Sequence, residues 1–345
     1  MRVKLEDVCE RGSSNLRQSD VIDKAGEYPI YGATGYLGDV DFYHQEKSYV
    51  AVVKDGAGIG RTTLHPAKSS VIGTMQYLIP KENILPEYLY YVVKHMHLEK
   101  YFTGATIPHI YYKDYKKETF SLAELELQVE IVSILKRVED IIAVRKQELE
   151  KLDELIKSRF IEMFGEPENN NKAWPVKPLD KLCAVGSSKR VYQSEQGFEG
   201  VPFWRISDLV SKIDTGTVDS TLFISEIKYT ELKRSGLVPV TGDILVTSRG
   251  TLGRCYIIKD EDRFYFQDGM ISWLSNYSEE ITPLYLQYLF TMSGFRKQID
   301  NMQAGSTVAY LSIAMLKKLQ VMVPDKALQD HFAAFVTQID KSKLH

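Results

Sequence analysis

The chain has 345 residues, of which 44% are hydrophobic, so it can form two or three domains with cores of their own. Its formal net charge of −3 argues against a protein that simply coats nucleic acid, although it says nothing about local basic patches. The sequence begins without the apolar segment of a signal peptide, has no apolar run near the length of a membrane span, and carries three scattered cysteines. We therefore expect a cytoplasmic protein with no membrane partner and no metal site.

An internal repeat dominates the sequence, because short matching segments recur in the same order in its two halves. Each copy opens on a Leu–Cys segment, passes through a Gly-Arg pair and ends at a Leu-Gln pair that begins a helical pattern. The matching segments are 5–9 and 179–183, 12–14 and 186–188, 29–31 and 202–204, 59–61 and 252–254, 86–91 and 283–288, 104–117 and 305–318, and 127–128 and 328–329. The repeat indicates one domain that is present twice, each copy being followed by a helix.

Each copy mixes strand-like and helical segments. We expect a short helix or strand first, then β-branched strands, and then a helix with Pro in its first turn. The segments are 4–9 and 178–185 for the opening, 48–53, 77–79, 243–247 and 271–274 for the strands, 86–97 and 283–296 for the helices, and 115–120 and 316–323 for the approach to the long helices. This mixture predicts an α+β globule with a small twisted sheet.

The predicted architecture is therefore two similar domains, separated by long coiled-coil helices and related by a pseudo-two-fold internal repeat. The first domain spans residues 1–123, and a long helix follows at 124–164. A polar linker at 165–175 leads to the second domain at 176–324. The last segment, 325–345, begins a second long helix that is cut short.

The second copy is longer than the first between its matching segments. Part of the extra length is residues 212–231, which we expect to be loop and strand. Because the matching segments are kept while the loops between them differ, the two copies suggest two binding sites that recognise different ligands.

The central helix carries a hydrophobic seam with a period of 3.5 residues, which is typical of a coiled coil. The seam residues are Ile131, Leu135, Val138, Ile142, Leu149, Leu152 and Ile156. Arg145 interrupts the seam, either as a polar layer that sets the register or as a side chain whose stem lies on the seam while its head reaches water.

The second seam begins again at Phe332, Val336 and Ile339 but stops within two heptads. We therefore expect Leu149, Leu152 and Ile156 to be exposed or covered by another chain. Self-association through this unpaired seam is a further expectation.

The sequence contains no catalytic motif that we can identify. The segment 55–60, Asp-Gly-Ala-Gly-Ile-Gly, resembles a nucleotide-binding loop, but a strand pattern follows it where a phosphate-binding loop requires a helix N-terminus. A tight turn between two strands is therefore favoured. We predict no catalytic residue, no metal and no cofactor bound by this chain.

The turns of both copies are rich in side chains that suit DNA. Arg and Lys suit guanine edges and phosphates, Gln suits adenine, and Asp can accept a hydrogen bond from cytosine. In the first copy the candidates are Tyr31, Thr34, Lys54, Asp55, Arg61, Thr74, Gln76, His109, Tyr111 and Lys113. In the second copy they are Trp204, Arg205, Ser248, Arg249, Arg254, Asp268, Thr307 and Tyr310. Surface loops often contain such residues, so the recurrence at equivalent turns is the stronger signal.

Taken together, these features resemble the specificity (S) subunit of type I restriction-modification systems. The resemblance covers the whole chain. Its carriers are the repeated globule and helix, the Leu–Cys openings, the Gly-Arg pairs at 60–61 and 253–254, the segments 104–106 and 305–307, the Leu-Gln helix starts and the junction 158–165.

The resemblance implies that each globule is a target recognition domain for one half of a bipartite site in double-stranded DNA. It implies antiparallel long helices that set the spacer and dock two methyltransferase (M) subunits, with restriction (R) subunits joining the complex. S-adenosylmethionine would bind in the M subunits, and this chain would be a non-catalytic subunit.

The short second helix departs from that pattern. The alternative hypothesis is a coiled-coil protein–protein adaptor with duplicated binding domains.

Overall fold

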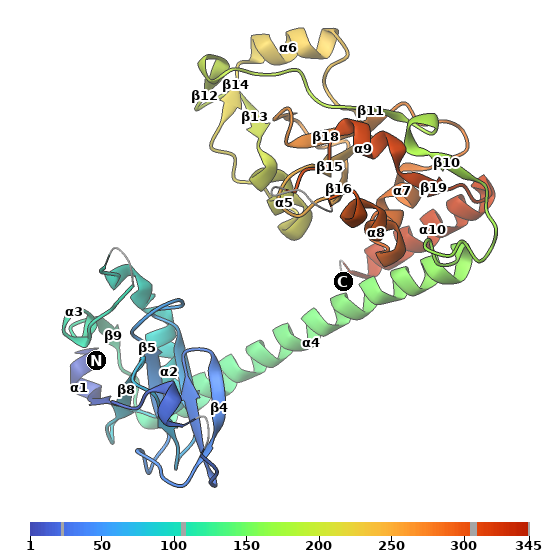
Figure 1. Ribbon diagram of the computed structural model, residues 1–345. Helices are drawn as coiled ribbons and strands as arrows, with labels where there is room; N and C mark the ends of the chain where they lie inside the picture. Colours follow the sequence, from blue (N-terminus) through green and yellow to red (C-terminus); the bar gives the residue numbers. More distant parts are fainter. Residues whose placement is uncertain (22–23, 105–107, 304–308, 344–345) are drawn as a thin grey trace. The chain divides into compact units, whose positions relative to one another are not determined.

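The computed structural model describes residues 1–21, 24–104, 108–303 and 309–343 (Figure 1). The chain divides into two compact units, Met1–Arg145 and Lys146–His345. The division falls inside the long helix α4, Leu125–Phe164, so the two ends of this helix belong to different units.

In the first unit, the two ends of the domain pair with each other. Strand β1 (Arg2–Lys4) lies antiparallel to β9 (Thr119–Ser121). The chain then forms the short helix α1 (Leu5–Val8), which places Leu5 and Val8 in the core. This pairing brings the start of the domain beside the segment that enters α4.

The main sheet of the first unit is antiparallel and has the strand order β2-β8-β5-β6. Its strands are β2 (Cys9–Ser13), β5 (Tyr49–Val53), β6 (Thr62–His65) and β8 (Met75–Pro80). All five residues of β5 are buried, because this β-branched strand lies between two others and is covered on both faces. The predicted strands at 48–53 and 77–79 are confirmed.

A smaller sheet, β4-β3-β7, flanks the main one. Its strands are β3 (Tyr28–Gly32), β4 (Gly35–Val40) and β7 (Ser70–Val71), and β3 is parallel to β7. The helical segments are η1 (Gln18–Asp20), α2 (Pro86–His95), η2 (Leu98–Tyr101) and α3 (Tyr112–Tyr115). Helix α2 begins at the predicted proline, whose fixed φ suits the first helical position.

The second unit repeats this topology. Its ends pair as β10 (Val176–Pro178) with β19 (Gln320–Met322), again antiparallel. Its main sheet has the order β11-β18-β15-β16, and its smaller sheet has the order β12-β14-β13-β17, in which β13 is parallel to β17. The strands are β11 (Ala184–Gly186), β12 (Gln196–Gly197), β13 (Val201–Trp204), β14 (Phe223–Ile224), β15 (Ile244–Thr247), β16 (Cys255–Ile257), β17 (Tyr265–Phe266) and β18 (Ile271–Ser275). The predicted internal repeat is therefore confirmed at the level of strand order.

The helices of the second unit correct two predictions. They are η3 (Leu179–Lys181), η4 (Gln193–Glu195), α5 (Ile206–Thr215), α6 (Glu226–Arg234), α7 (Pro283–Leu289), α8 (Ser293–Asn301), α9 (Ile313–Lys318) and α10 (Lys326–Lys343). The segment 212–231, expected to be loop and strand, does contain a loop and strand β14, but it also contains the end of α5 and most of α6. The single helix expected at 283–296 is broken into α7 and α8, because Met292 is extended (ψ 135°) and caps a new helix.

The predicted seam of α4 is only partly buried. At its N-terminal end the seam residue Ile131 is half-buried against the core of the first unit, beside the buried Val132, whereas Val138 and Ile142 are 45% and 62% exposed. At the other end Ile156 is fully buried, so the expectation that it is exposed or covered by another chain is wrong. Leu149 and Leu152 are half-buried.

Helix α10 covers this end of α4. The ring of Phe332 lies 5.5 Å from that of Phe160, and Lys343 Nζ lies 2.8 Å from Asp153 Oδ1. Because the residue numbers rise along α10 as they fall along α4, the two helices are antiparallel. The short second helix therefore pairs with the last turns of the first.

A buried glutamine ties each long helix to its own domain. Gln128 Oε1 accepts a hydrogen bond from Leu85 N at 2.8 Å, and its Nε2 donates to Asn83 O and Ala123 O at 3.0 and 2.8 Å. Leu85 is the N-cap of α2, so one carboxamide joins that helix, the preceding loop and the entry to α4.

Gln329 makes the same arrangement in the second unit. It accepts from Thr282 N at 2.9 Å and donates to Glu280 O and Pro324 O, both at 2.8 Å. The Leu-Gln pair that the repeat singled out thus marks the buried attachment point of each helix.

We predict that Gln128→Ala lowers the free energy of unfolding by about 2–4 kcal/mol, because it leaves buried backbone groups without partners. Gln147→Ala is the matched control, since Gln147 is exposed on the same helix, and should change stability by less than about 0.5 kcal/mol. Chemical denaturation of the two variants measures both values. Equal losses in the two variants would contradict the proposed attachment.

Candidate nucleic-acid interface

The hairpin turns after β5 and β15 share one hydrogen-bond frame. In the first unit Val53 N donates to Arg61 O and Gly60 N donates to Val53 O, both at 2.9 Å. In the second unit Thr247 N donates to Arg254 O and Gly253 N donates to Thr247 O, again at 2.9 Å. Positions in the two turns can therefore be compared one by one.

The glycine of each Gly-Arg pair has a structural role. Gly60 has a φ of +81°, and a Cβ there would lie 2.5 Å from Glu99 N. Gly253 has a φ of +70°, and its Cβ would lie 2.7 Å from Ile299 Cδ1. Strand β6 follows the first turn, so the favoured prediction for 55–60, a tight turn between strands, is confirmed.

We predict that Gly60→Ala destabilises the protein by about 3 kcal/mol or more, because strain at positive φ adds to a clash with backbone. Gly56 lies in the same turn with a φ of +86° and open space around its Cβ position. Gly56→Ala should therefore cost only the conformational strain, about 1–2 kcal/mol. Denaturation midpoints of the two variants test the difference, and equal midpoints would show that the close approach to Glu99 is unimportant.

The first unit gathers five predicted residues around one pocket of about 220 Å³. They are Lys54, Asp55, Gln76, Tyr111 and Lys113, and Arg11 on β2 joins them. Three cations around a concave site favour an anionic ligand such as a nucleic-acid backbone.

Contacts within this pocket hold its polar side chains in place. His109 Nδ1 lies 2.6 Å from Asp55 Oδ1, and Lys54 Nζ lies 3.9 Å from Asp55 Oδ2. Lys113 Nζ lies 5.2 Å from the centre of the Tyr111 ring, which is 50% exposed. Tyr111 thus offers an aromatic face beside a cation, an arrangement that suits stacking against a base.

Other predicted residues of the first unit form a second group. Arg61 donates to Ala33 O, so it reaches the β3–β4 turn that carries the exposed Thr34. The Tyr31 ring packs 4.4 Å from that of His65. Thr74 contributes its backbone, accepting from Lys54 N at 3.0 Å.

In the second unit the predicted arginines have different partners. The guanidinium of Arg249 lies 4.5 Å from the centre of the Tyr310 ring. Arg254 pairs with Asp214, with Nη1 3.2 Å from Oδ2, and Arg205 Nη2 donates to Thr221 Oγ1 at 3.2 Å. Asp268 pairs with the exposed Arg190 at 2.9 Å.

The structure places three predicted DNA contacts in the interior, which corrects them. Trp204 is 5% exposed and stacks on Phe264 with ring centroids 3.6 Å apart. Ser248 is 1% exposed and bonds to Ser272, and Gln76 is 3% exposed and donates to Gly12 O. Their side chains are satisfied inside the fold, so a contact with DNA would require unpacking. Gln76 thus lines the pocket of about 220 Å³ as a structural residue. Thr307 lies outside the described residues.

Sequence reasoning missed two basic residues at these sites, Arg11 and Arg190. Both follow the Leu–Cys opening of their copy, Arg11 on β2 and Arg190 just after β11. In the first unit, β2 pairs with the predicted strand β8, and this pairing brings Arg11 to the side of the sheet where Gln76 lies. The long-range strand pairing that reveals this is not visible along the chain.

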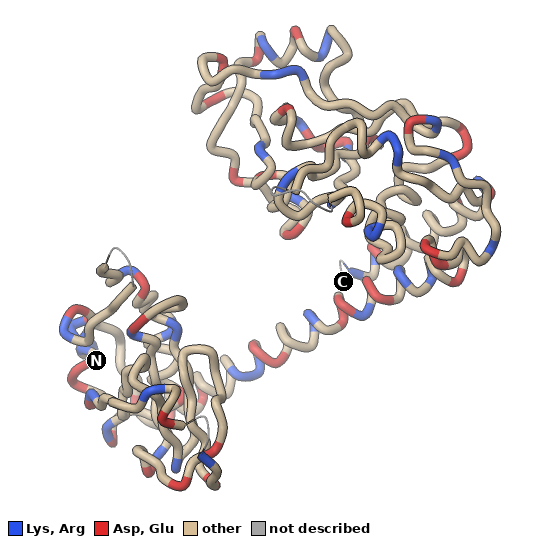
Figure 2. Tube along the Cα trace, in the orientation of Figure 1, with Lys and Arg blue, Asp and Glu red and all other residues tan. Residues whose placement is uncertain are grey.

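Charge does not single out another surface. Figure 2 shows acidic and basic residues interspersed in both units. No group of three or more His, Cys, Asp or Glu that could hold a metal ion occurs among the described residues. Burial raises the pKa of the thiols of Cys9 and Cys183 to about 12 and also raises that of Cys255, so these cysteines present no thiolate at neutral pH.

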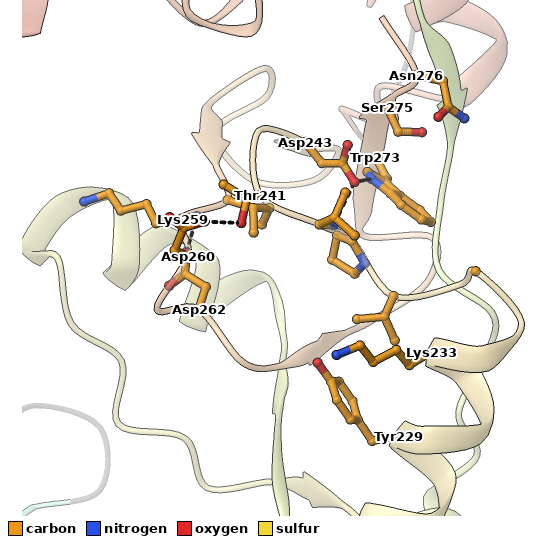
Figure 3. Close-up of a pocket in the computed structure, with 15 residues that line it drawn as sticks. Tyr229, Lys233, Thr241, Asp243, Lys259, Asp260, Asp262, Trp273, Ser275 and Asn276 are labelled. Atoms are coloured by element: carbon orange, nitrogen blue, oxygen red, sulfur yellow. Dashed lines mark hydrogen bonds between the residues drawn. The ribbon is translucent and has the colours of Figure 1, made fainter.

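A larger pocket of about 520 Å³ lies in the second unit between α6, the segments that precede β15 and follow β16, and the end of β18 (Figure 3). Its buried carboxylate, Asp243, accepts from Trp273 Nε1 at 2.8 Å and from Val240 N at 2.9 Å. Burial raises the pKa of Asp243, while these two hydrogen bonds oppose the shift. Because its carboxylate is used to close the turn at Val240 and to join that turn to Trp273 on β18, Asp243 has a structural role, and we assign it no catalytic role.

Comparison with known proteins identifies the class to which this fold belongs. A family model described as the type I restriction modification DNA specificity domain matches residues 1–154 and again residues 171–345. The chain therefore belongs to the family of type I restriction-modification specificity subunits, with the domain present twice. This finding does not favour the protein–protein adaptor hypothesis.

Individual relatives agree with that assignment. A type I restriction enzyme specificity subunit of Haemophilus influenzae is 24% identical over 92% of this chain and 81% of its own length. A specificity subunit of Methanocaldococcus jannaschii is 25% identical over 91% of this chain and 80% of its own length. The solved S subunit of M. genitalium has the same fold, with a TM-score of 0.58 and 17% identity over 99% of this chain and 90% of that one.

None of the described helices is both long enough and apolar enough to cross a membrane.

Proposed function

We propose that this chain selects the DNA sequence on which a type I restriction-modification complex acts, each unit recognising one half of a bipartite target. One observation carries the proposal. The two units share strand order and turn hydrogen bonds but present different side chains at the same place, Asp55 beside His109 in one and Arg249 beside Tyr310 in the other. Equal frames with unequal chemistry suit two half-sites of different sequence.

The long helix supplies the spacing in this proposal. Helix α4 has 40 residues and runs unbroken through the boundary between the units. At about 1.5 Å per residue it is about 60 Å long. A buried glutamine fixes its first turn to one domain, and Ile156 and Phe160 fix its last turns to the other.

The middle of α4 is the proposed docking surface for partner subunits. Its apolar side chains are exposed in this chain, and a contiguous exposed apolar surface usually marks a site where another protein binds. They are Ile134, Val138, Ile141, Ile142 and Val144, which are 45–67% exposed. We propose that two methyltransferase subunits bind there and that restriction subunits join them.

Catalysis would then reside in the partners. We propose that the methyltransferase subunits bind S-adenosylmethionine and methylate adenine, and that this chain binds no cofactor. Its net charge of −3 predicts weak binding to double-stranded DNA alone, with the partners supplying most phosphate contacts. The complex would act on chromosomal DNA in the cytoplasm.

Methylation mapping tests this function. We predict that cells co-expressing the chain with its methyltransferase carry methyladenine at a motif of two short halves separated by an unspecified spacer. Replacing residues 176–324 with the equivalent domain of a relative should change one half only. An assembled complex that methylates no bipartite motif would overturn the proposal and return attention to the adaptor hypothesis.

Deleting residues 138–144 from α4 tests the role of the helix. The deletion shortens α4 by about 10 Å with a rotation of only about 20°, so the preferred spacer should shorten by about three base pairs, or methylation should be lost. Replacing the same seven residues by alanine keeps the helix length and is the control. Because this control also removes proposed docking side chains, it should lower the methylated fraction, but the sites that remain methylated should keep the original spacer. An unchanged spacer in the deletion variant would contradict the role of α4.

A further inference from the structure

Asp55 and His109 form a side-chain pair in the first unit, and Arg249 and Tyr310 form a pair at the equivalent backbone position in the second. Lys54 O accepts from Ile110 N at 3.0 Å, and Ser248 O accepts from Leu311 N at 3.0 Å. Ile110 and Leu311 are 2% and 0% exposed, so each anchors its segment in the core. The second residue after the strand, Asp55 or Arg249, therefore faces the residue before the anchor in both units.

A second pair of hydrogen bonds holds each segment from its other side. In the first unit the backbones of Thr103 and His109 bond to each other twice, at 2.9 Å each. In the second unit the side chain of Gln303 takes the place of that backbone. Its Oε1 accepts from Tyr310 N at 2.8 Å, and its Nε2 donates to Tyr310 O at 3.2 Å. The amide side chain reproduces the peptide pattern, so two hydrogen bonds hold the position in each unit.

The chemistry at this shared position is opposite in the two units. The first unit presents a carboxylate, Asp55, which can only accept hydrogen bonds when ionised and is held by His109 Nδ1 at 2.6 Å. The second presents a guanidinium, Arg249, which can only donate. An acceptor matches the exocyclic amine of cytosine, whereas the arginine fork matches O6 and N7 of guanine.

The Arg249 side chain is held in a defined plane. Its guanidinium lies over the Tyr310 ring, and its Nε is buried without a hydrogen-bond partner among the described residues. Stacking on the ring orients the two terminal nitrogens without using their hydrogens. A rigid donor pair is what bidentate recognition of one base requires.

We propose that these two pairs are the equivalent specificity-determining positions of the two recognition domains, and that Arg249 contacts a guanine in the half-site of the second domain. The proposal rests on the DNA-recognition function proposed above. Asp55, with His109 as its positioning residue, contacts a base that offers an amine in the other half-site, and Gln303 positions Tyr310 under Arg249.

Arg249→Lys is the decisive variant, because it keeps the charge and most of the stem but loses the fork. The variant chain is co-expressed with its methyltransferase, and the methylated fraction is measured at every site in the genome. We expect discrimination in favour of guanine at one position of one half-site to fall roughly tenfold or more, while the other half is retained. An arginine that only binds phosphate predicts an unchanged motif, and that result would overturn the proposal.

Asp55→Asn provides the reciprocal test in the first domain and should relax one position in the opposite half. Arg234→Gln is the control, since Arg234 ends α6 outside this position, and should leave the motif unchanged. If the Arg249→Lys chain does not accumulate with the methyltransferase, the Asp55→Asn variant provides the test. The proposal then requires a loss of base discrimination at one position of the first domain's half-site only. Equal loss at all sites, or relaxation in both halves, would also overturn the proposal.

Failure of this inference can be told apart from failure of the proposed function. A wild-type complex without a bipartite motif would overturn the function itself. A bipartite motif whose second-domain half, identified by exchange of residues 176–324, contains no G·C pair would overturn only the assignment of Arg249.

Discussion

The buried carboxamide at the start of each long helix is the interaction on which the structure depends. Gln128 and Gln329 are both fully buried, and each joins a helix cap, a loop and the entry of the long helix. Because water cannot replace a lost partner there, each hydrogen bond is worth more than it would be at the surface. This side chain therefore helps to fix the direction in which each long helix starts, together with the apolar residues of its first turns. Any use of the helix as a spacer depends on this.

The duplicated frame separates stability from recognition. Backbone hydrogen bonds, a positive-φ glycine and a buried anchor hold the hairpin turn in each unit, and these groups are the same in kind. The side chains of Asp55, His109, Arg249 and Tyr310 contribute little to the hydrogen bonds and packing that hold the turn. They can therefore diverge without loss of fold, which is how two copies of one domain come to present a carboxylate and a guanidinium at one position.

Much of the fold could be predicted from the sequence because its signals are local. The β-branched run at 48–53, Pro86 and the uninterrupted helical stretch each report on neighbouring residues. The candidate site was harder to predict. Lys54, Asp55, Tyr111 and Lys113 do meet at one pocket, but Trp204, whose match to Tyr31 suggested a surface turn, is a core residue stacked on Phe264. Helices α5 and α6 were missed because they belong to an insertion with no counterpart in the first copy.

The sequence by itself determined that one domain occurs twice, that each copy leads into a helix, and that the first helix is long, because repetition and periodicity are properties of residue order. Only the tertiary structure decided which seam residues are covered. Ile142 and Ile156 occupy equivalent positions in the heptad seam. Ile156 is nevertheless buried in the core that includes α10, whereas Ile142 is exposed. It also decided that His109 faces Asp55 and that Arg249 lies over Tyr310. These contacts join residues more than 50 positions apart, and strand pairing and core packing create them.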